Sequence, residues 1–562
     1  PPAPQPGPGA DSRKQGLISG LLGLNVVLLG VALITGQLFN SGGQQNQEAR
    51  VFLLLLMGVS VAWMLWYLLW ARKQPDMSPH QDHHAGGVAA TMVLVLFAGL
   101  SVLLFVCMIG YLMMMRECKP VPRVVSPFIE ASFLTLQAYF LWCHSKDCIH
   151  RHKVVTRSGL ILILSADVLL WLNAVTEDTI HEEIELEKEG CSFSPDSHCD
   201  DYQNLSAGPG ISDLNLCRCG TNSSCLAFRK GVEVLYPFTM EFYLMAGCMI
   251  YVMWKNVGRQ VSPGHHHVTQ KLTFDLLRQG RVIYGLVSGA LVILVGLVIF
   301  ILYQLWVSWQ KFRHLAFLML YVYHIVVIPL MSLCCLVGLL VHRVERHVKE
   351  GGYNPTRNLD VVLLIATASG QLALSYFSLV AALTVGAEGP LASLDLSYSI
   401  LTLLELLLQN TFIIEGLHRH PNLLAEKKKK KKHRMIKVKP TFQLTFIMAQ
   451  FNSKKRIVAV KGFILSHSPT ERRWEGEPAV RVHDGKKPWA QRIIKEICAF
   501  LILSNIMMWV IPAFGVHPQF EIGFGKQFFG FSAWFALVNL SQPLSVFYRM
   551  HSVAALMELL LM

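Results

Sequence analysis

The sequence predicts an all-α polytopic membrane protein in which twelve transmembrane helices form two related six-helix halves with both termini cytosolic. Three observations support this fold class. The composition is strongly apolar, twelve separate stretches are long enough to cross a bilayer, and short motifs of the first half recur in the same order in the second half.

The composition excludes an ordinary soluble protein. Of the 562 residues, 52% are hydrophobic and 15% are charged, and the mean hydropathy is +0.41. A soluble protein carries about 25% charged residues. The formal net charge of +13 could indicate a nucleic-acid partner, but membrane proteins also carry excess Lys and Arg on their cytosolic side. The long apolar stretches favour the membrane protein, so no nucleic-acid partner is expected.

Each apolar stretch is close to the roughly 20 residues that a helix needs to span the hydrocarbon core. The first six spans belong to an N-terminal half at 16–260 and the other six to a C-terminal half at 261–562. Residues 1–15 are rich in Pro and Gly and are expected to be disordered, without a cleavable signal peptide. The predicted spans are residues 16–39, 51–71, 88–115, 125–143, 158–180, 232–254, 282–306, 315–341, 360–384, 396–417, 494–512 and 527–549.

The distribution of basic residues orients the helices. An even number of spans puts both termini on one side, and with that side inside, most of the 50 Lys and Arg residues lie in inner loops. Because basic residues concentrate on the cytosolic side, both termini are predicted to be cytosolic. The inner loop 418–492 carries six consecutive lysines, Lys427 to Lys432. This run suits either a solvated tether or a patch for anionic membrane lipids.

The outer loop at residues 182–231 has the features of an extracellular segment. It contains two acceptor sequences for N-glycosylation, at Asn204 and Asn222. Five of its residues are cysteines and a sixth lies in another outer loop, which suits disulfides in an oxidising compartment. The seven other cysteines are predicted to pack as small apolar residues. Cys217 and Cys219 could bind a metal, but their spacing matches no zinc pattern, so no resident metal site is predicted.

Two motifs of the first half return in the second half. LTLQAYF is echoed by LLLQNTF, and DVLLW is echoed by NIMMW. The echoes align Gln137 with Gln409 and Asp167 with Asn505. The polar side chains of the two halves are therefore predicted to have a similar arrangement but to differ in charge.

Several polar side chains are predicted to lie near the middle of the membrane. An acid at that depth costs several kcal/mol unless it faces a cavity or a partner, so such residues indicate a polar pathway. Amides and carboxylates can pass protons along hydrogen bonds without a wide pore. No carbonyl filter and no ring of acids is evident in the sequence, which favours protons as the transported species. The predicted pathway residues are Gln137, Asp167, Glu241, Glu405, Gln409, Asn505 and Asn539.

Structural explanations compete with this functional one. A membrane-embedded amide often serves only a helix–helix hydrogen bond, and this explanation applies to Asn505 and Asn539. A salt bridge could also hold a mid-span acid, since Arg549, predicted at the inner end of the last span, has no evident partner in the sequence. His324, with Tyr321 one turn earlier, is either a packing residue or a second titratable group.

The outer end of the fifth span carries Glu177, Asp178 and His181 on adjoining helix faces. Histidine titrates near physiological pH. This cluster is therefore a candidate acid sensor at the outer mouth.

Three segments resemble signature segments of the otopetrin family, namely SKDCIHRH, YPFTMEFYLMAGCMIYVMWKNVGR and the closing NLSQPLSVFYRMHSVAALMEL. The resemblance covers nearly all twelve spans and is weakest at the N-terminus, in the Cys-rich loop and in loop 418–492. In the family pattern the residue before the LLW or MMW stretch is typically Asn, where the first half here has Asp167. The family's polar positions match at Gln137, Glu177, Glu241, Glu405, Gln409, Asn539 and His551.

The resemblance implies a proton-selective channel of the plasma membrane that extracellular acid activates and extracellular zinc blocks. It also implies a homodimer whose subunits each form two barrel-like halves, with sterol-like lipids between the elements. Apart from zinc as an inhibitor and the sterol, no cofactor is implied. Asp167 would either add a charge to the first-half route or be neutral through protonation at that depth.

Other functions are compatible with parts of the pattern. A proton-coupled secondary transporter is the main alternative and would also use repeats and midplane acids, but no matched pair of Gly/Pro helix breaks is found. An intramembrane enzyme would need a His beside an acid or thiol at the membrane surface. Only His418 and His420 beside Glu415 offer this, so no catalytic residue is predicted. A receptor or scaffold without transport is a further alternative.

Overall fold

The computed structural model of the chain is almost entirely helical. The glycosylation acceptors Asn204 and Asn222, loop 418–487 and most of the Cys-rich loop lie outside the residues that the structure describes. The described residues are 8–39, 48–71, 80–81, 88–114, 121–149, 152–193, 223–258, 282–307, 309–344, 355–386, 390–417, 488–515 and 524–561.

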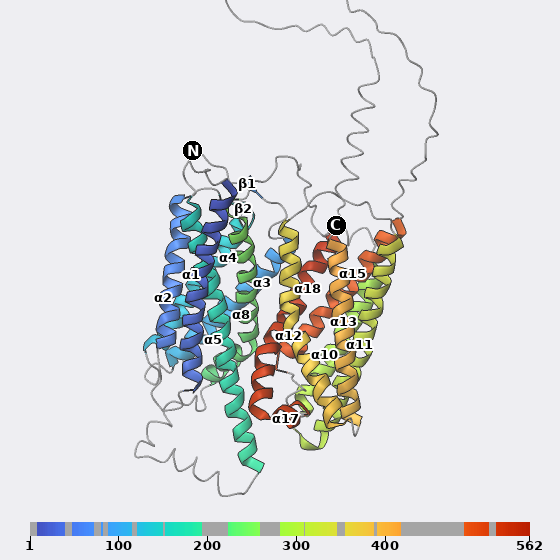
Figure 1. Cartoon of the computed structure of the whole chain (residues 1–562). Coiled ribbons are helices and arrows are strands. Elements are labelled where there is room, and N and C mark those ends of the chain that lie inside the picture. Colours follow the sequence, from blue (N-terminus) through green and yellow to red (C-terminus); the bar gives the residue numbers. More distant parts are fainter. Residues whose placement is uncertain are drawn as a thin grey trace, which may run out of the picture. The chain divides into compact units, whose positions relative to one another are not determined.

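Long helices follow one another along the chain, with one short pair of strands (Figure 1). The strands β1 (His80–Gln81) and β2 (Asp147–Cys148) are antiparallel. The helices are α1 (Pro8–Phe39), α2 (Glu48–Trp66) with the π-helical turn η1 (Tyr67–Ala71), α3 (Val88–Met114), α4 (Val121–His144), α5 (Lys153–Phe193), α8 (Ser223–Asn256), α10 (Ile283–Trp306), α11 (Gln310–Val344), α12 (Pro355–Val385), α13 (Pro390–Leu417), α15 (Pro488–Ala513), α17 (Phe524–Phe529) and α18 (Phe531–Leu561).

Within the described ranges, 12 helices are long and apolar enough to cross a membrane. This confirms the predicted number of spans. The short helix α17 is not among them. α1 begins and α18 ends at the same end of the bundle, as an even number of spans requires (Figure 1). That this end faces the cytosol stays a prediction.

Some helices extend beyond the predicted spans. α5 continues to Phe193 and α8 begins at Ser223, so both run into the predicted outer loop. Charged residues interrupt an apolar pattern, but Glu and Lys are good helix formers, and the helix continues through them. The last span, predicted at 527–549, instead follows a break at Gly530 (φ 82°) and runs to Leu561.

Four helix pairs of the first six spans pack together in the same way as their counterparts in the last six. In the first set, α2 packs against α1 and α4, and α3 packs against α4 and α8. In the second set, α11 packs against α10 and α13, and α12 packs against α13 and α18. This repetition supports the predicted relation between two halves, and their barrel-like form stays a prediction.

Glycines bring corresponding helices close together in both sets. A Cβ on Gly30 of α1 would lie 2.4 Å from Cδ1 of Leu169 on α5. A Cβ on Gly296 of α10 would lie 2.6 Å from Cγ of Met507 on α15. Leu169 and Met507 are the third residues of the two echoed motifs, DVLLW and NIMMW. Small residues let membrane helices approach closely. The similarity between the two halves therefore includes the helix packing around the echoed motifs.

The helices differ in how much of their surface the protein covers. The most apolar window of α5 is 72% buried and that of α18 is 61% buried, whereas those of α1 and α10 are each 22% buried. Large apolar side chains such as Leu28 and Leu294 are exposed on these two outer helices. α5 and α18 are therefore the central helices, and they carry Asp167 and Arg549.

The cysteines of the described residues follow the predicted division. Cys225, from the predicted outer loop, is disulfide-bonded. The seven cysteines in or near the spans are free thiols: Cys107, Cys143, Cys148, Cys248, Cys334, Cys335 and Cys498.

Candidate functional site

A buried polar cluster in the first set joins α4 and α5. Nε2 of Gln137 donates to both carboxylate oxygens of Asp167, at 3.0 and 2.7 Å. Both side chains are almost completely buried. Oε1 of Gln137 accepts no hydrogen bond from any described residue. The buried hydroxyl of Tyr243 on α8, which interacts electrostatically with Asp167, likewise has no hydrogen-bond partner there.

A second cluster joins the equivalent helices of the second set. Nδ2 of Asn505 on α15 donates to Oε1 of Gln409 on α13 at 2.7 Å, and Nε2 of Gln409 donates back to Oδ1 of Asn505 at 3.2 Å. Nε2 of Gln409 also lies 3.2 Å from the hydroxyl oxygen of Tyr548 on α18. The cluster therefore holds an amide pair and a tyrosine in completely buried positions.

The two clusters correspond residue by residue. The echoed motifs place a glutamine on one helix against Asp167 or Asn505 on another, and the structure brings both pairs into hydrogen-bond contact. Tyr243 and Tyr548 were not predicted. The sequence did carry a signal for them, because they occupy the same place in the short echo FYLM and FYRM. The chemical difference is that Asp167 is a carboxyl group where Asn505 is an amide.

A buried ion pair distinguishes the second cluster further. Nη1 of Arg549 on α18 lies 3.0 Å from Oε1 of Glu405 on α13 and 3.2 Å from Oδ1 of Asn505. The prediction that Arg549 lies at the inner end of the last span is wrong, because α18 continues to Leu561. A charge in mid-helix is tolerated here because Glu405 compensates it. The salt-bridge explanation therefore applies to Glu405.

The first set has apolar residues where the second has this ion pair. The echoed motifs align Glu405 with Phe133, and the FYLM and FYRM echo aligns Arg549 with Leu244. Among the residues that the structure describes, the acid of the first cluster thus has no cation beside it, whereas the acid of the second cluster has one.

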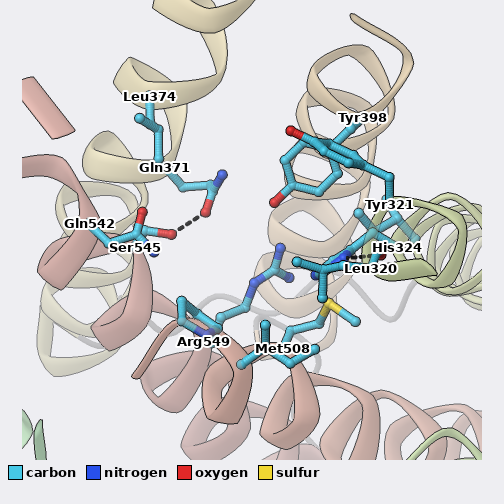
Figure 2. A pocket seen from close by; sticks show the side chains of 13 residues that line it. Leu320, Tyr321, His324, Gln371, Leu374, Tyr398, Met508, Gln542, Ser545 and Arg549 are labelled. Atoms are coloured by element: carbon cyan, nitrogen blue, oxygen red, sulfur yellow. Dashed lines mark hydrogen bonds between the residues drawn. The ribbon is translucent and has the colours of Figure 1, made fainter. Parts of the chain in front are cut away.

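A cavity opens beside Arg549 in the second set (Figure 2). Its volume of about 40 Å³ is enough for a few water molecules. Figure 2 shows the guanidinium of Arg549 directed between Gln371 and the tyrosine rings of Tyr321 and Tyr398. The lining residues are Leu320, Tyr321, His324, Ile328, Gln371, Leu374, Tyr398, Met508, Ile511, Pro512, Gln542, Ser545 and Arg549.

Hydrogen bonds hold the polar walls of this cavity in place. The hydroxyl of Tyr321 donates to Oδ1 of Asp395 at 2.8 Å, and the hydroxyl of Ser545 donates to Gln371. Nδ1 of His324 lies 2.8 Å from the carbonyl oxygen of Leu320. His324 therefore combines packing with a position in the cavity wall. Asp395 and Gln371 were not predicted, since each is a single polar residue outside the echoed motifs.

Glu241 lies between the two sets of helices. It is buried on α8, and its Oε1 accepts a hydrogen bond from the indole Nε1 of Trp509 on α15 at 3.2 Å. Its Oε2 is buried with no partner in the described part of the chain.

The remaining predicted residues lie apart from the clusters. Glu177 is partly exposed and forms an ion pair with Arg50 on α2. Asp178 and His181 belong to α5, but their side chains are outside the described residues. Asn539 makes no hydrogen bond through Nδ2 within the described residues, and His551 is half-buried near the backbone of Asp360 rather than at a helix end.

The described residues contain no group of three or more His, Cys, Asp or Glu side chains arranged to hold a metal ion. The chemistry that the site offers is hydrogen bonding and proton exchange among carboxyl, amide, hydroxyl and indole groups. Buried polar atoms with no protein partner are the positions at which buried water binds in proteins.

Comparison with known proteins gives one consistent result. The family model for otopetrin matches residues 91–454 and 474–550. The chain is 37% identical to the human proton channel OTOP3 over 551 residues, which cover 98% of this chain and 86% of that protein. It is 34% identical to the human proton channel OTOP2 over 99% of this chain and 97% of that protein. It is 30% identical to the mouse proton channel OTOP1 over 99% of this chain and 92% of that protein.

Proposed function

Because the chain belongs to the otopetrin family, we propose that it is a proton channel that conducts H⁺ across a membrane through its helix bundle. Relatives of nearly full length are named as proton channels, which favours a channel over a proton-coupled transporter and over an enzyme. The twelve apolar helices are consistent with a multi-pass membrane protein.

The observation that carries the proposal is the buried Gln137–Asp167 pair. A carboxyl group held by an amide, with no cation, can take up and release a proton without separating an ion pair. The adjacent hydroxyl of Tyr243 and the free oxygen of Gln137 supply further positions for a hydrogen-bonded chain. Such chains pass protons through a dense interior without a wide pore.

The acids of the chain differ in their suitability for this role. Within the described part of the chain, Asp167 and Glu241 accept hydrogen bonds only from neutral donors, Gln137 and Trp509. Glu405 is paired with Arg549, so proton exchange there first requires the ion pair to open. We therefore place the preferred route through the first cluster and Glu241, with Gln409, Asn505 and Glu405 as a second, gated route.

Further properties remain part of the proposal. The otopetrin resemblance suggests a plasma-membrane location, a homodimer, association with a sterol-like lipid, activation by extracellular acid, and zinc as an inhibitor. The acid sensor is proposed at Glu177, Asp178 and His181. The membrane-spanning part of α5 ends at Glu177, which is partly exposed beside Arg50, and this position supports access from water.

The sensor has its own test. His181→Ala is expected to shift the dependence of current on external pH or the sensitivity to external zinc, because it removes the imidazole of the cluster. Whole-cell recording at a series of external pH values measures both. An unchanged pH–current curve together with an unchanged zinc block would contradict the assignment.

Reconstitution tests the function itself. Purified protein in liposomes should carry a current whose reversal potential follows the pH gradient and ignores potassium and chloride gradients. A coupled transporter would require a second solute for net flux. Protein that leaves a pH gradient intact while the membrane potential is held at zero would refute the proposal.

A further inference from the structure

We propose that Trp509 is a positioning residue for Glu241, whose indole N–H holds one carboxylate oxygen and leaves the other to exchange protons. This inference rests on the proposed function, since it concerns how an acid of the route is held. It adds Trp509, which is not among the predicted pathway residues.

The contact crosses between the two sets of helices. Trp509 lies on α15 of the second set and Glu241 on α8 of the first, 268 residues apart in the chain. Nε1 donates to Oε1 at 3.2 Å, and both side chains are buried. Because Oε2 has no partner among the described residues, the two oxygens of one carboxyl group are chemically distinct.

Aromatic rings hold the indole in place. Trp509 stacks on Phe97 of α3 with ring centroids 6.1 Å apart and an interplanar angle of 27°. Phe238 of α8 lies 5.5 Å away at 47°, and Phe514 meets the indole edge-on at 6.2 Å. Aromatic pairs in these arrangements stabilise each other beyond simple burial. The direction of the N–H is therefore set by three rings from three separate segments.

The echoed motif supplies a natural comparison. DVLLW ends in Trp171 and NIMMW ends in Trp509, so the two tryptophans occupy equivalent positions on α5 and α15. Both are largely buried, but Nε1 of Trp171 has no partner in the described part of the chain. The motif therefore provides a buried tryptophan in both sets. Within the described residues, the indole N–H of Trp509 donates to an acid and that of Trp171 does not.

No charged group of the described residues binds Glu241 in competition with Trp509. The ionisable side chains on helices packed against α8 include Glu130 on α4, Asp167 on α5, Asp360 on α12 and Arg549 on α18. Within the described residues, none of them forms an ion pair or hydrogen bond with Glu241. Asp167 packs against Gly247 of α8, where an added Cβ would lie 3.6 Å from Cβ of Asp167. Gly247 is almost two turns from Glu241 along the helix. The Trp509 N–H is therefore the one described donor to this carboxyl group.

The experiment compares Trp509→Phe with Trp171→Phe in liposomes, because each removes one indole N–H and keeps an aromatic ring. Trp509→Phe should lower proton flux about tenfold and move the pH of half-maximal flux about one unit higher, since a charge-assisted hydrogen bond to the carboxylate is lost. Trp171→Phe should leave both quantities at the wild-type values. Adding Trp509→Phe to Glu241→Gln should cause no further loss, because the two residues act as one unit.

The outcomes separate this inference from the proposed function. If Trp509→Phe matches Trp171→Phe while Glu241→Gln still lowers flux, the positioning role is overturned and the route through Glu241 stands. If Glu241→Gln conducts normally, the role of Glu241 in the proposed route fails and the positioning role falls with it. Should Trp509→Phe not assemble, Phe97→Leu removes the stacked ring but keeps the N–H. It should shift the pH profile in the same direction, and an unshifted profile would overturn the inference.

Discussion

At the scale of single residues, the buried acids are distinguished by the charge of what holds them. Asp167 accepts from an amide, Glu241 from an indole and Glu405 from a guanidinium. A neutral donor stabilises a carboxylate without cancelling its charge, whereas an arginine cancels it. From the sequence alone these three acids look alike. In the structure, Asp167 and Glu241 accept from neutral donors, whereas Glu405 is paired with a charged one.

The ion pair predicts a specific pattern of stability. Arg549→Leu alone should lower the free energy of unfolding by about 3–5 kcal/mol, because it leaves the buried carboxylate of Glu405 uncompensated. The double substitution Glu405→Phe and Arg549→Leu, which copies the aligned Phe133 and Leu244, should recover most of that loss. Thermal unfolding in detergent measures both. A double variant as unstable as the single one would contradict the account of the pair.

The sequence predicted part of the site because the motifs repeat. The echoed motifs predict that Gln137 is equivalent to Gln409 and Asp167 to Asn505. That each glutamine contacts its partner on the neighbouring helix was not predicted and is seen only in the structure. The partner of Arg549 could not be predicted, because contact between α13 and α18 depends on helix rotation and depth rather than on spacing. The same holds for Trp509 and Glu241, which approach only when the two sets of helices meet.

At the scale of helices, close packing rather than polarity sets the arrangement. The peripheral helices α1 and α10 approach α5 and α15 through glycines, and they expose most of their remaining surface. The clearest case is Gly285 on α10. Its N–H donates to Oε2 of Glu496 at 2.6 Å, and an added Cβ would lie 2.0 Å from the carbonyl oxygen of Glu496.

This approach can be tested with a matched pair of variants. Gly285→Ala should destabilise the protein by about 1–3 kcal/mol, because the clash is with backbone that cannot move aside cheaply. Gly36→Ala on α1 is the control, since a Cβ there has no atom within 4 Å. The shift in thermal midpoint of each variant measures the difference. Equal midpoints would show that α10 and α15 are not held in the described register.

Apolar length predicts the number of membrane helices better than it predicts their ends. All twelve spans found in the described residues were predicted, because a run of about 20 apolar residues is the length that a helix needs to cross the membrane. The fifth span, predicted at 158–180, corresponds to the span Lys153–Glu177. The end of the last span was misplaced, since treating Arg549 as the edge of the membrane segment cuts the span short of Leu561. α18 shows why this fails: Arg549 interrupts the apolar pattern in mid-helix and is neutralised by a residue on another helix.

At the scale of the whole membrane domain, two sets of helices with similar packing carry different charge. The first set holds Asp167 with neutral partners, and the second holds an ion pair beside a small cavity. Glu241 and Trp509 join the sets. Under the proposed function, these two similar frameworks give one route that is ready to exchange protons and one that must first break a salt bridge.

Proton flux into liposomes, measured side by side for three proteins, tests this claim most directly. Asp167→Asn gives the first cluster the amide of the second, and Glu405→Phe with Arg549→Leu removes the second acid together with its cation. The account predicts that Asp167→Asn lowers flux about tenfold or more, as the loss of an exchangeable group implies, while the double variant keeps flux close to that of the wild type. Normal flux in Asp167→Asn, with flux abolished in a correctly folded double variant, would contradict it.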